Sequence, residues 1–165
     1  METYSKALNG GQYPLSVLAV NERAAKVYAK GTYGNTMTTN PRAMDIATNV
    51  LNSLTPDIRA NIRNKGQVAL VKLNALKAEL GGLITKVQGT GLLFSCELDP
   101  SFKCYGANST EEYMRERGIG VIHGGTNSLR FTPHFGITSA EMDLMISHIR
   151  LALLNGPRKQ EAAAA

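Results

Sequence analysis

The sequence has no tryptophan, and aromatic residues make up only 6% of its 165 residues. Its two cysteines, Cys96 and Cys104, are too few for a disulfide framework, so we expect free thiols in a reducing compartment. No apolar run approaches the roughly 18 residues that predict a membrane span. The N-terminus is polar and lacks the apolar segment of a signal peptide. These absences predict a soluble intracellular protein of the cytoplasm or the mitochondrial matrix.

Blocks of like charge are absent too, although the formal net charge is +5. The basic residues are scattered through predicted helices, whereas a nucleic-acid surface needs a basic face interleaved with aromatics, so we expect no nucleic-acid partner. His123 and His134 do not have metal-ligand spacing with either cysteine, which predicts no metal site. We interpret His123, which precedes two glycines, as satisfying a turn.

The first half of the chain is rich in helix signals, and strands alternate with helices in the second half, which is typical of an α+β or α/β fold. Gly66 interrupts the apolar stripe of the longest predicted helix and is expected to bend it. The predicted elements are a buried strand at 15–20, helices at 21–29, 41–53, 55–80, 109–117 and 138–155, and strands at 84–87, 92–98, 119–122 and 128–132.

Lys6 lies before the glycine pair Gly10 and Gly11 and an apolar strand, a place suited to the Schiff-base amine of a pyridoxal phosphate (PLP) enzyme. An amine attacks an aldehyde only when unprotonated, so such a lysine needs burial or a cationic neighbour to lower its pKa. The glycines would let the backbone pass close to a planar cofactor. The alternative is a surface lysine before a turn.

A second site candidate is the loop that contains Asn35 and Thr36 and leads to the helix start at Asn40 and Pro41. Backbone N–H groups, a threonine hydroxyl and a helix dipole can together bind a phosphate. The alternative is an ordinary loop that ends in a helix cap.

Arg130 is the third candidate, because it lies inside an apolar strand where an unpaired guanidinium would be costly. Its planar fork matches a carboxylate at two positions. We expect it either to pair with an internal acid or to receive a substrate carboxylate. The alternative is an arginine on an edge strand that points to solvent.

These signals occur together in an order that resembles one family. The chain is similar, from about Thr3 to about Leu154, to the C-terminal portion of the class III aminotransferases, the ornithine and acetylornithine aminotransferase-like PLP enzymes. Asn9 departs from the pattern, since the family often has glycine there. The resemblance rests on the final helix and on four collinear motifs: SKALNGGQYPLSVL, GTYGNTMTTNPRAMDIATNVL, VQGTGLLFSCEL and RGIGVIHGGTNSLRFTP.

The resemblance implies roles for the candidate residues. Lys6 would form the Schiff base with PLP and shuttle the substrate's proton. Thr36, with Asn35 beside it, would bind the cofactor phosphate in the neighbouring subunit's site. Arg130 would lie near the substrate carboxylate, or pair with a glutamate as in some members. The family's complete enzyme is an obligate homodimer.

The resemblance also implies a fold and its division. The expected class is α/β with an α+β small domain, as the C-terminal part of a fold type I PLP-dependent transferase that lacks most of the large domain. Residues 1–50 would be the end of the large domain with the lysine and the connecting helix. Residues 51–155 would be the small domain, and 156–165 a flexible tail with nothing to bury.

The implied activity is transfer of an amino group from an ω-amino or basic amino acid, such as ornithine, to a 2-oxo acid such as 2-oxoglutarate. PLP chemistry also needs an acid on the pyridine nitrogen, a phosphate cradle and a ring-stacking residue, which the family supplies upstream of the lysine. We therefore expect the chain alone to be inactive, with residues 1–40 poorly held or held by another chain, such as the missing N-terminal half. The alternative is a non-catalytic remnant that serves as a structural or interaction subunit.

Overall fold

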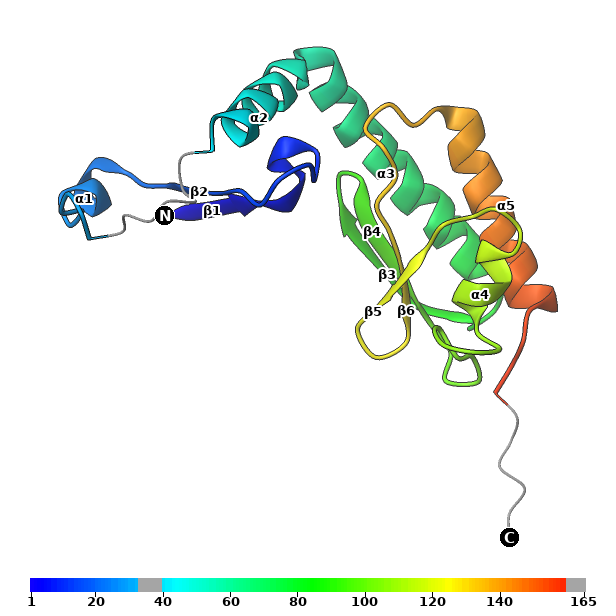
Figure 1. Cartoon of the computed structure of the whole chain (residues 1–165). Coiled ribbons are helices and arrows are strands. Elements are labelled where there is room, and N and C mark those ends of the chain that lie inside the picture. Colours follow the sequence, from blue (N-terminus) through cyan, green and yellow to red (C-terminus); the bar gives the residue numbers. More distant parts are fainter. Residues whose placement is uncertain (33–39, 160–165) are drawn as a thin grey trace, which may run out of the picture. The chain divides into compact units, whose positions relative to one another are not determined.

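The structure is a computed structural model that describes residues 1–32 and 40–159. The chain divides into two compact units, Met1–Pro56 and Asp57–Ala165 (Figure 1). Asn35 and Thr36 lie outside the described residues. No helix of the described part is both long and apolar enough to cross a membrane.

The first unit begins with a two-stranded antiparallel ribbon formed by β1 (Glu2–Ser5) and β2 (Ser16–Ala19). The 3-10 helix η1 (Lys6–Asn9) follows β1 directly. Every residue of both strands is exposed, so the expectation of a buried strand at 15–20 is wrong within the described chain. A ribbon of two strands has two faces to cover, and the described part of this unit covers neither.

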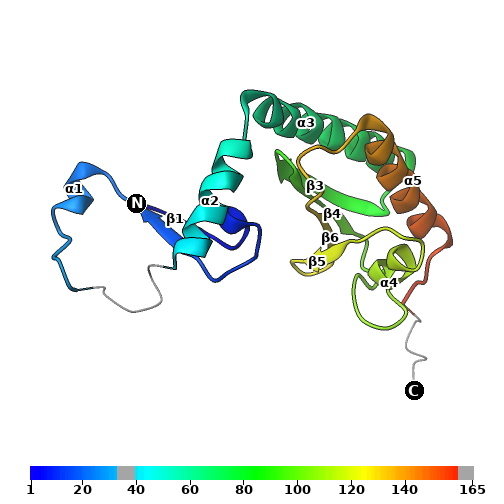
Figure 2. The ribbon, with the colours of Figure 1, turned by 45° about the horizontal axis from the view of Figure 1, so that its top comes forward.

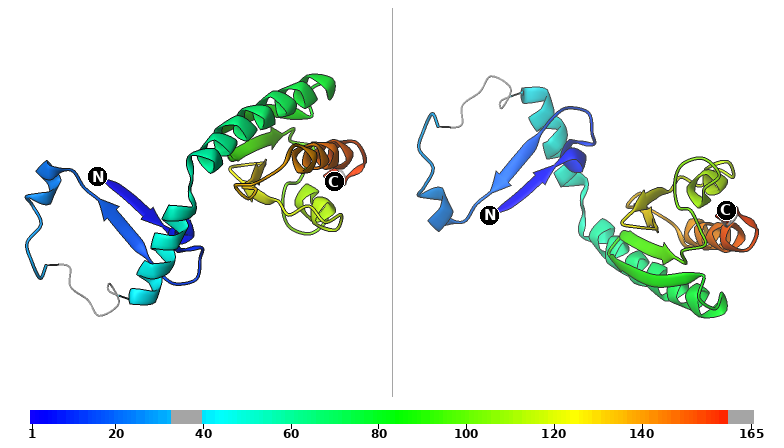
Figure 3. Two further views of the ribbon diagram at one scale, coloured as in Figure 1. Left: turned by 90° about the horizontal axis from the view of Figure 1, so that it is seen from above. Right: turned by 90° about the horizontal axis from the view of Figure 1, so that it is seen from below.

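Two helices complete the first unit. α1 (Glu22–Ala25) begins where the predicted helix 21–29 does, and the Asn21 side chain caps it by accepting from the backbone of Ala24. It is shorter than predicted, since none of its residues is buried and a short helix without packing is marginal. α2 (Pro41–Ser53) has the predicted bounds, is capped by the Asn40 side chain and lies against η1 (Figure 3).

The second unit is built on a four-stranded sheet of β3 (Ile84–Thr90), β4 (Leu93–Leu98), β5 (Ile122–Gly124) and β6 (Ser128–Phe131). The strand order is β3-β4-β6-β5, and every neighbouring pair is antiparallel. β5 lies later than the strand predicted at 119–122. Its pairing with β6 begins only at Ile122, opposite Arg130, because the register of this hairpin is set from the turn at 125–127.

Helices α3 (Pro56–Glu79) and α5 (Ser139–Asn155) cover one face of this sheet, and α4 (Thr110–Arg115) packs on α5 (Figure 2). α4 ends two residues before its predicted end. The core lies between the helices and the sheet. The largest fully buried side chains of the core are those of Phe94, Phe102, Leu73, Ile84, Leu98, Met114, Leu129, Met142, Ile149 and Leu153.

The segment after α5 has contacts that the sequence did not predict. The Arg158 guanidinium lies 3.8 Å from the centre of the Phe102 ring and donates to the Ser101 hydroxyl at 3.0 Å. The backbone N–H of Lys159 donates to the Ser101 carbonyl at 2.7 Å. The chain up to Lys159 therefore differs from the expected tail with nothing to bury, and residues 160–165 lie outside the described residues.

Candidate functional site

Lys6 occupies an unusual backbone conformation that no sequence pattern predicts. Its φ is +59°, which makes it one of two non-glycine residues in the left-handed region among those described. That conformation costs an L-residue roughly 1–2 kcal/mol. Such strain is found preferentially at functional sites, where the surrounding structure enforces it. The backbone thus favours a functional interpretation of Lys6 over that of an ordinary surface lysine.

The turn around Lys6 is held by short-range hydrogen bonds. Gly10 closes η1 in the left-handed conformation and donates its N–H to the Ala7 carbonyl at 3.0 Å. Asn9 is fully buried, and its Nδ2 donates to the Tyr13 carbonyl at 2.7 Å. Its Oδ1 is buried without a partner among the described residues. The buried Asn9 amide thus ties η1 to the chain at Tyr13, although its oxygen has no partner among the described residues.

The two glycines that follow η1 are not crowded by the described chain. Neither Gly10 nor Gly11 has an atom of the described chain within 4 Å of the point where a Cβ would lie, and both have positive φ. The glycines are needed here for their backbone conformation rather than for lack of space. Lys6 itself is exposed, so the described chain does not supply the burial that a reactive amine needs. The structure thus places Lys6 as an exposed amine at the start of η1, beside the glycine pair, and leaves its predicted role untested.

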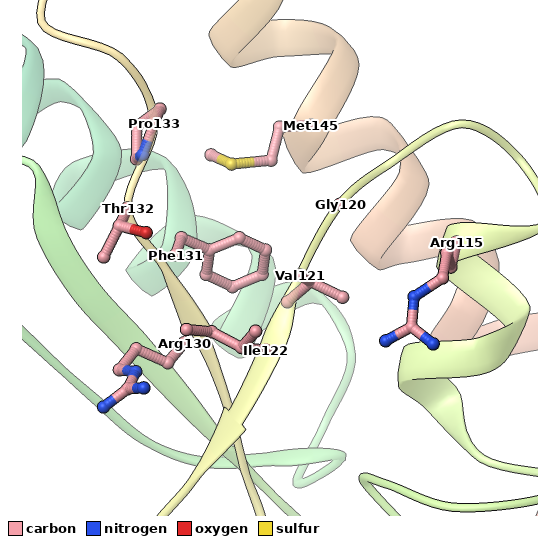
Figure 4. Close-up of a pocket in the computed structure, with 9 residues that line it drawn as sticks. All are labelled: Arg115, Gly120, Val121, Ile122, Arg130, Phe131, Thr132, Pro133 and Met145. Carbon is pink, nitrogen blue, oxygen red and sulfur yellow. The ribbon is translucent and has the colours of Figure 1, made fainter. Parts of the chain in front are cut away.

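Arg130 lies at the centre of the sheet of the second unit. β6 is flanked by β4 and β5, so the interpretation of Arg130 as an edge-strand arginine is wrong. The Phe131 ring points into the core side while the Arg130 guanidinium points away from it (Figure 4). Among residues 40–159, no hydrogen bond or ion pair of this guanidinium is found, and the side chain is exposed. Its fork is thus available to a carboxylate from outside the second unit.

Two hollows meet at Arg130. One, of about 350 Å³, also includes Arg115, Val121 and Met145 (Figure 4). The other, of about 470 Å³, lies on the side of β3 and β4. An arginine shared by two hollows can hold an anion at the mouth of either one.

The sequence analysis missed a charged cluster next to the first hollow. Glu111, buried in the first turn of α4, accepts from His123 of β5 at 3.0 Å and also pairs with Arg115. The His123 ring stacks on Tyr105 with centroids 4.3 Å apart. His123 therefore does not simply satisfy a turn, as predicted, but joins β5 to α4. The contact of Glu111 with His123 joins residues 12 positions apart on different elements, and it leaves no local pattern from which it could be foreseen.

Comparison with known proteins identifies the family. Residues 1–153 match the aminotransferase class-III family, and the chain belongs to that family. It is 30% identical over 151 residues to succinylornithine transaminase of Citrobacter koseri, an alignment that covers 91% of this chain and 36% of the relative.

Solved structures give the same result for the fold. The acetylornithine aminotransferase of Elizabethkingia anophelis matches with a TM-score of 0.80 and 27% identity, over 92% of this chain and 40% of the other. The ornithine aminotransferase of Toxoplasma gondii, whose structure has partial occupancy of PLP at its active site, matches with a TM-score of 0.79 and 24% identity, over 92% and 36%. The chain thus has the fold of the C-terminal part of fold type I aminotransferases, and spans well under half the length of these relatives.

Proposed function

We propose that this chain is the C-terminal portion of a PLP-dependent aminotransferase that moves an amino group from an ω-amino or basic amino acid, such as ornithine, to a 2-oxo acid. The observation that carries the proposal is Lys6, held at φ +59° in a hydrogen-bonded turn within a chain of the class III family. The relatives that act on succinylornithine, acetylornithine and ornithine support a substrate of this kind.

Each candidate residue has a role in this proposal. PLP, when bound, supplies the electron sink that labilises the bonds at the substrate's Cα. The Nζ of Lys6 holds the cofactor and, once released, moves the proton at that carbon. Asn35 and Thr36 bind the cofactor phosphate, and the Arg130 fork orients the substrate through its carboxylate.

The proposal requires a second polypeptide portion. The N-terminal part of the enzyme supplies the acid for the pyridine nitrogen, the phosphate cradle and the group that stacks on the ring, and the complete enzyme is a homodimer. This part also covers Lys6, whose side chain is exposed in the described chain. The isolated chain is therefore inactive, and activity returns on assembly.

The test is reconstitution with the N-terminal part of a class III aminotransferase in the presence of PLP. We expect transamination and, after borohydride reduction, a covalent cofactor adduct that mass spectrometry places on Lys6. Lys6→Ala removes both the adduct and turnover, while Lys26→Ala, an exposed lysine of the same unit, retains them. An adduct on another lysine, or none at any ratio of the two parts, contradicts the proposal.

A second function, that of a non-catalytic interaction subunit, is favoured by the ribbon of the first unit. Tyr4, Val17 and Leu18 are between 43% and 59% exposed on β1 and β2. Apolar surface of this kind is typical of a partner site. Co-purification of a stable partner with the Lys6→Ala variant, without any activity of the unmutated complex, supports this function. A chain that is monomeric and partner-free contradicts it.

A further inference from the structure

The chain beyond α5 is fastened to the loop at 99–104, which follows β4. The Arg158 guanidinium lies 3.8 Å from the centre of the Phe102 ring and donates to the Ser101 hydroxyl at 3.0 Å. The backbone N–H of Lys159 donates to the Ser101 carbonyl at 2.7 Å. Arg158 and Lys159, here called the latch, therefore hold this loop through a charged side chain and through the backbone.

The latch also matches the loop in charge. Asp99 begins the loop, and hydrogen bonds from Ser101 lower the pKa of its carboxyl group, with smaller contributions from the charges of Arg158 and Lys159. The two cations therefore lie near a carboxylate that is ionised at neutral pH. Because opposite charges attract, this arrangement favours the closed position of the latch.

The same loop has a second attachment on the side of the sheet. Asn127, in the turn between β5 and β6, donates from its Nδ2 to the carbonyls of Leu98, Asp99 and Phe102 at 3.2, 3.1 and 3.2 Å. Its Oδ1 accepts from the N–H of Cys104 at 3.2 Å. These bonds do not involve the latch, so the backbone of the loop stays tied to the sheet when the latch is open.

The latch covers groups that are buried although they lie in a loop. Phe102 is fully buried, and the group over its ring is the guanidinium of Arg158, which is itself exposed. Cys104 is 2% exposed, and burial raises the pKa of its thiol to about 12, with Glu111 adding to the rise and the charge of Lys159 opposing it. The latch therefore lies over Phe102 and close to the Cys104 thiol.

We propose that the latch is a reversible cover, which opens without unfolding of the second unit and uncovers Phe102 and the Cys104 thiol. One stacked guanidinium and a few exposed hydrogen bonds stabilise the closed latch far less than the core stabilises the unit, so the latch opens first. It lies beyond residues 1–153, which match the family, and it does not depend on the proposed function. Loss of the latch leaves a folded unit with an accessible thiol and an uncovered aromatic ring.

Two deletions test the latch. Deletion of residues 157–165 removes it, and deletion of residues 160–165 is the matched control that keeps it. Both chains are treated with iodoacetamide at pH 8, and the labelled thiol is identified by mass spectrometry of its peptide. We expect labelling of Cys104 to be faster by roughly tenfold in the shorter chain. Cys96, fully buried on β4, should stay unlabelled in both chains, because the unit remains folded.

Point variants of the full chain separate the latch from the length of the chain. Arg158→Ala should raise the rate of Cys104 labelling. Arg158→Lys should raise it less, because lysine keeps the charge but lacks the flat guanidinium. Arg117→Ala is the matched control, since Arg117 makes the same kind of contact with Tyr113 of α4, at 3.5 Å from the ring centre, and its loss should leave the rate unchanged.

Two outcomes overturn the inference. One is a rate of Cys104 labelling that is the same in the two deletion chains. The other is equally rapid labelling of Cys96 and Cys104 in the shorter chain, which would mean that the whole unit opens. Neither outcome bears on the proposed aminotransferase function, which the reconstitution experiment tests separately.

Discussion

Gly66 of α3 approaches Gly91, in the turn between β3 and β4, so closely that a Cβ on Gly66 would lie 2.2 Å from the Gly91 carbonyl oxygen. Gly91 has φ +54°, and a Cβ there would meet the Ile62 side chain at 3.0 Å. The helix and the hairpin thus touch through their backbones. Neither glycine can therefore carry a side chain without a shift of α3 or of the β3–β4 turn.

Gly66→Ala should destabilise the second unit. The substitution places a methyl group against backbone that cannot turn aside, and such overpacking costs about 1–3 kcal/mol. Alanine regains about 1 kcal/mol of helix propensity, so a net loss of up to about 2 kcal/mol is expected. Urea unfolding followed by circular dichroism measures this loss.

Gly120→Ala is the control for that experiment. A Cβ on Gly120 would meet no described atom within 4 Å, and its φ is not in the left-handed region. Its unfolding midpoint should stay near that of the unmutated chain. If Gly66→Ala is as stable as Gly120→Ala, the close contact at Gly91 is not what fixes the hairpin.

The role of Gly66 also illustrates what the sequence could predict. Periodicity located α3 correctly, but a glycine in a helical pattern was interpreted as a bend. The structure has one continuous helix from Pro56 to Glu79, with the glycine at a backbone contact. A contact of this kind depends on residues 25 positions apart, for which local spacing gives no signal.

The sequence located the start of a helix reliably where a capping residue marks it. Asn40 caps α2 at the predicted helix start, and Thr138, the first residue of the predicted helix 138–155, caps α5. Ser109, where the predicted helix 109–117 begins, caps α4 by accepting from the backbone of Glu112, while the Glu112 carboxylate accepts from the Asn108 N–H. Arg130 was recognised as unusual from its apolar neighbours. The residues that line the hollow beside Arg130 were not predicted, because the order and register of the strands depend on the whole sheet.

Lys6 provides a prediction on backbone strain. Lys6→Gly removes the strain at φ +59° and should protect the amides of Gly10 and Gln12, which close the turn, against hydrogen exchange. Lys6→Ala keeps a Cβ in the same conformation and should not protect them. Equal exchange rates in the two variants would show that the turn imposes no strain on residue 6.

The cap of α5 provides a prediction at acid pH. The Glu141 carboxylate accepts from the backbone N–H and the hydroxyl of Thr138, at 2.7 and 2.8 Å, and these bonds hold the pKa of Glu141 below its ordinary value. The unfolded state therefore binds a proton at Glu141 more readily than the folded state does. The Glu141 carboxylate contributes its full stabilisation above the ordinary carboxyl pKa, and this stabilisation is lost as pH falls through the lowered pKa of the folded state.

Glu141→Gln tests this directly, because the amide keeps an acceptor oxygen but does not titrate in this range. The unmutated chain should have the higher urea midpoint at pH 7, and the two midpoints should converge as pH falls below 4. A constant difference across this range would mean that the Glu141 charge does not stabilise the cap. Thr138→Ala removes the cap hydroxyl and should cost about 1 kcal/mol at pH 7.

The two thiols provide a prediction at alkaline pH. Burial raises the pKa of Cys96 to about 12, with a smaller contribution from Cys104, and burial likewise raises the pKa of Cys104 to about 12. Both pKa values exceed those of the unfolded chain, where thiols ionise freely. Below the ordinary thiol pKa, ionisation of these two thiols does not lower the free energy of unfolding. Above it, the thiols ionise in the unfolded chain only, so the free energy of unfolding falls as pH rises toward 12.

We expect the free energy of unfolding to fall by roughly 1.4 kcal/mol for each pH unit per thiol above the ordinary pKa. Cys96→Ala should be less stable at pH 7, because it leaves a cavity, but should lose less stability between pH 9 and pH 10.5. Iodoacetamide should accordingly label neither thiol in the folded chain at pH 8 and both after unfolding in urea. Rapid labelling of Cys96 in the folded chain would contradict its burial, and an unchanged alkaline slope in Cys96→Ala would contradict its raised pKa.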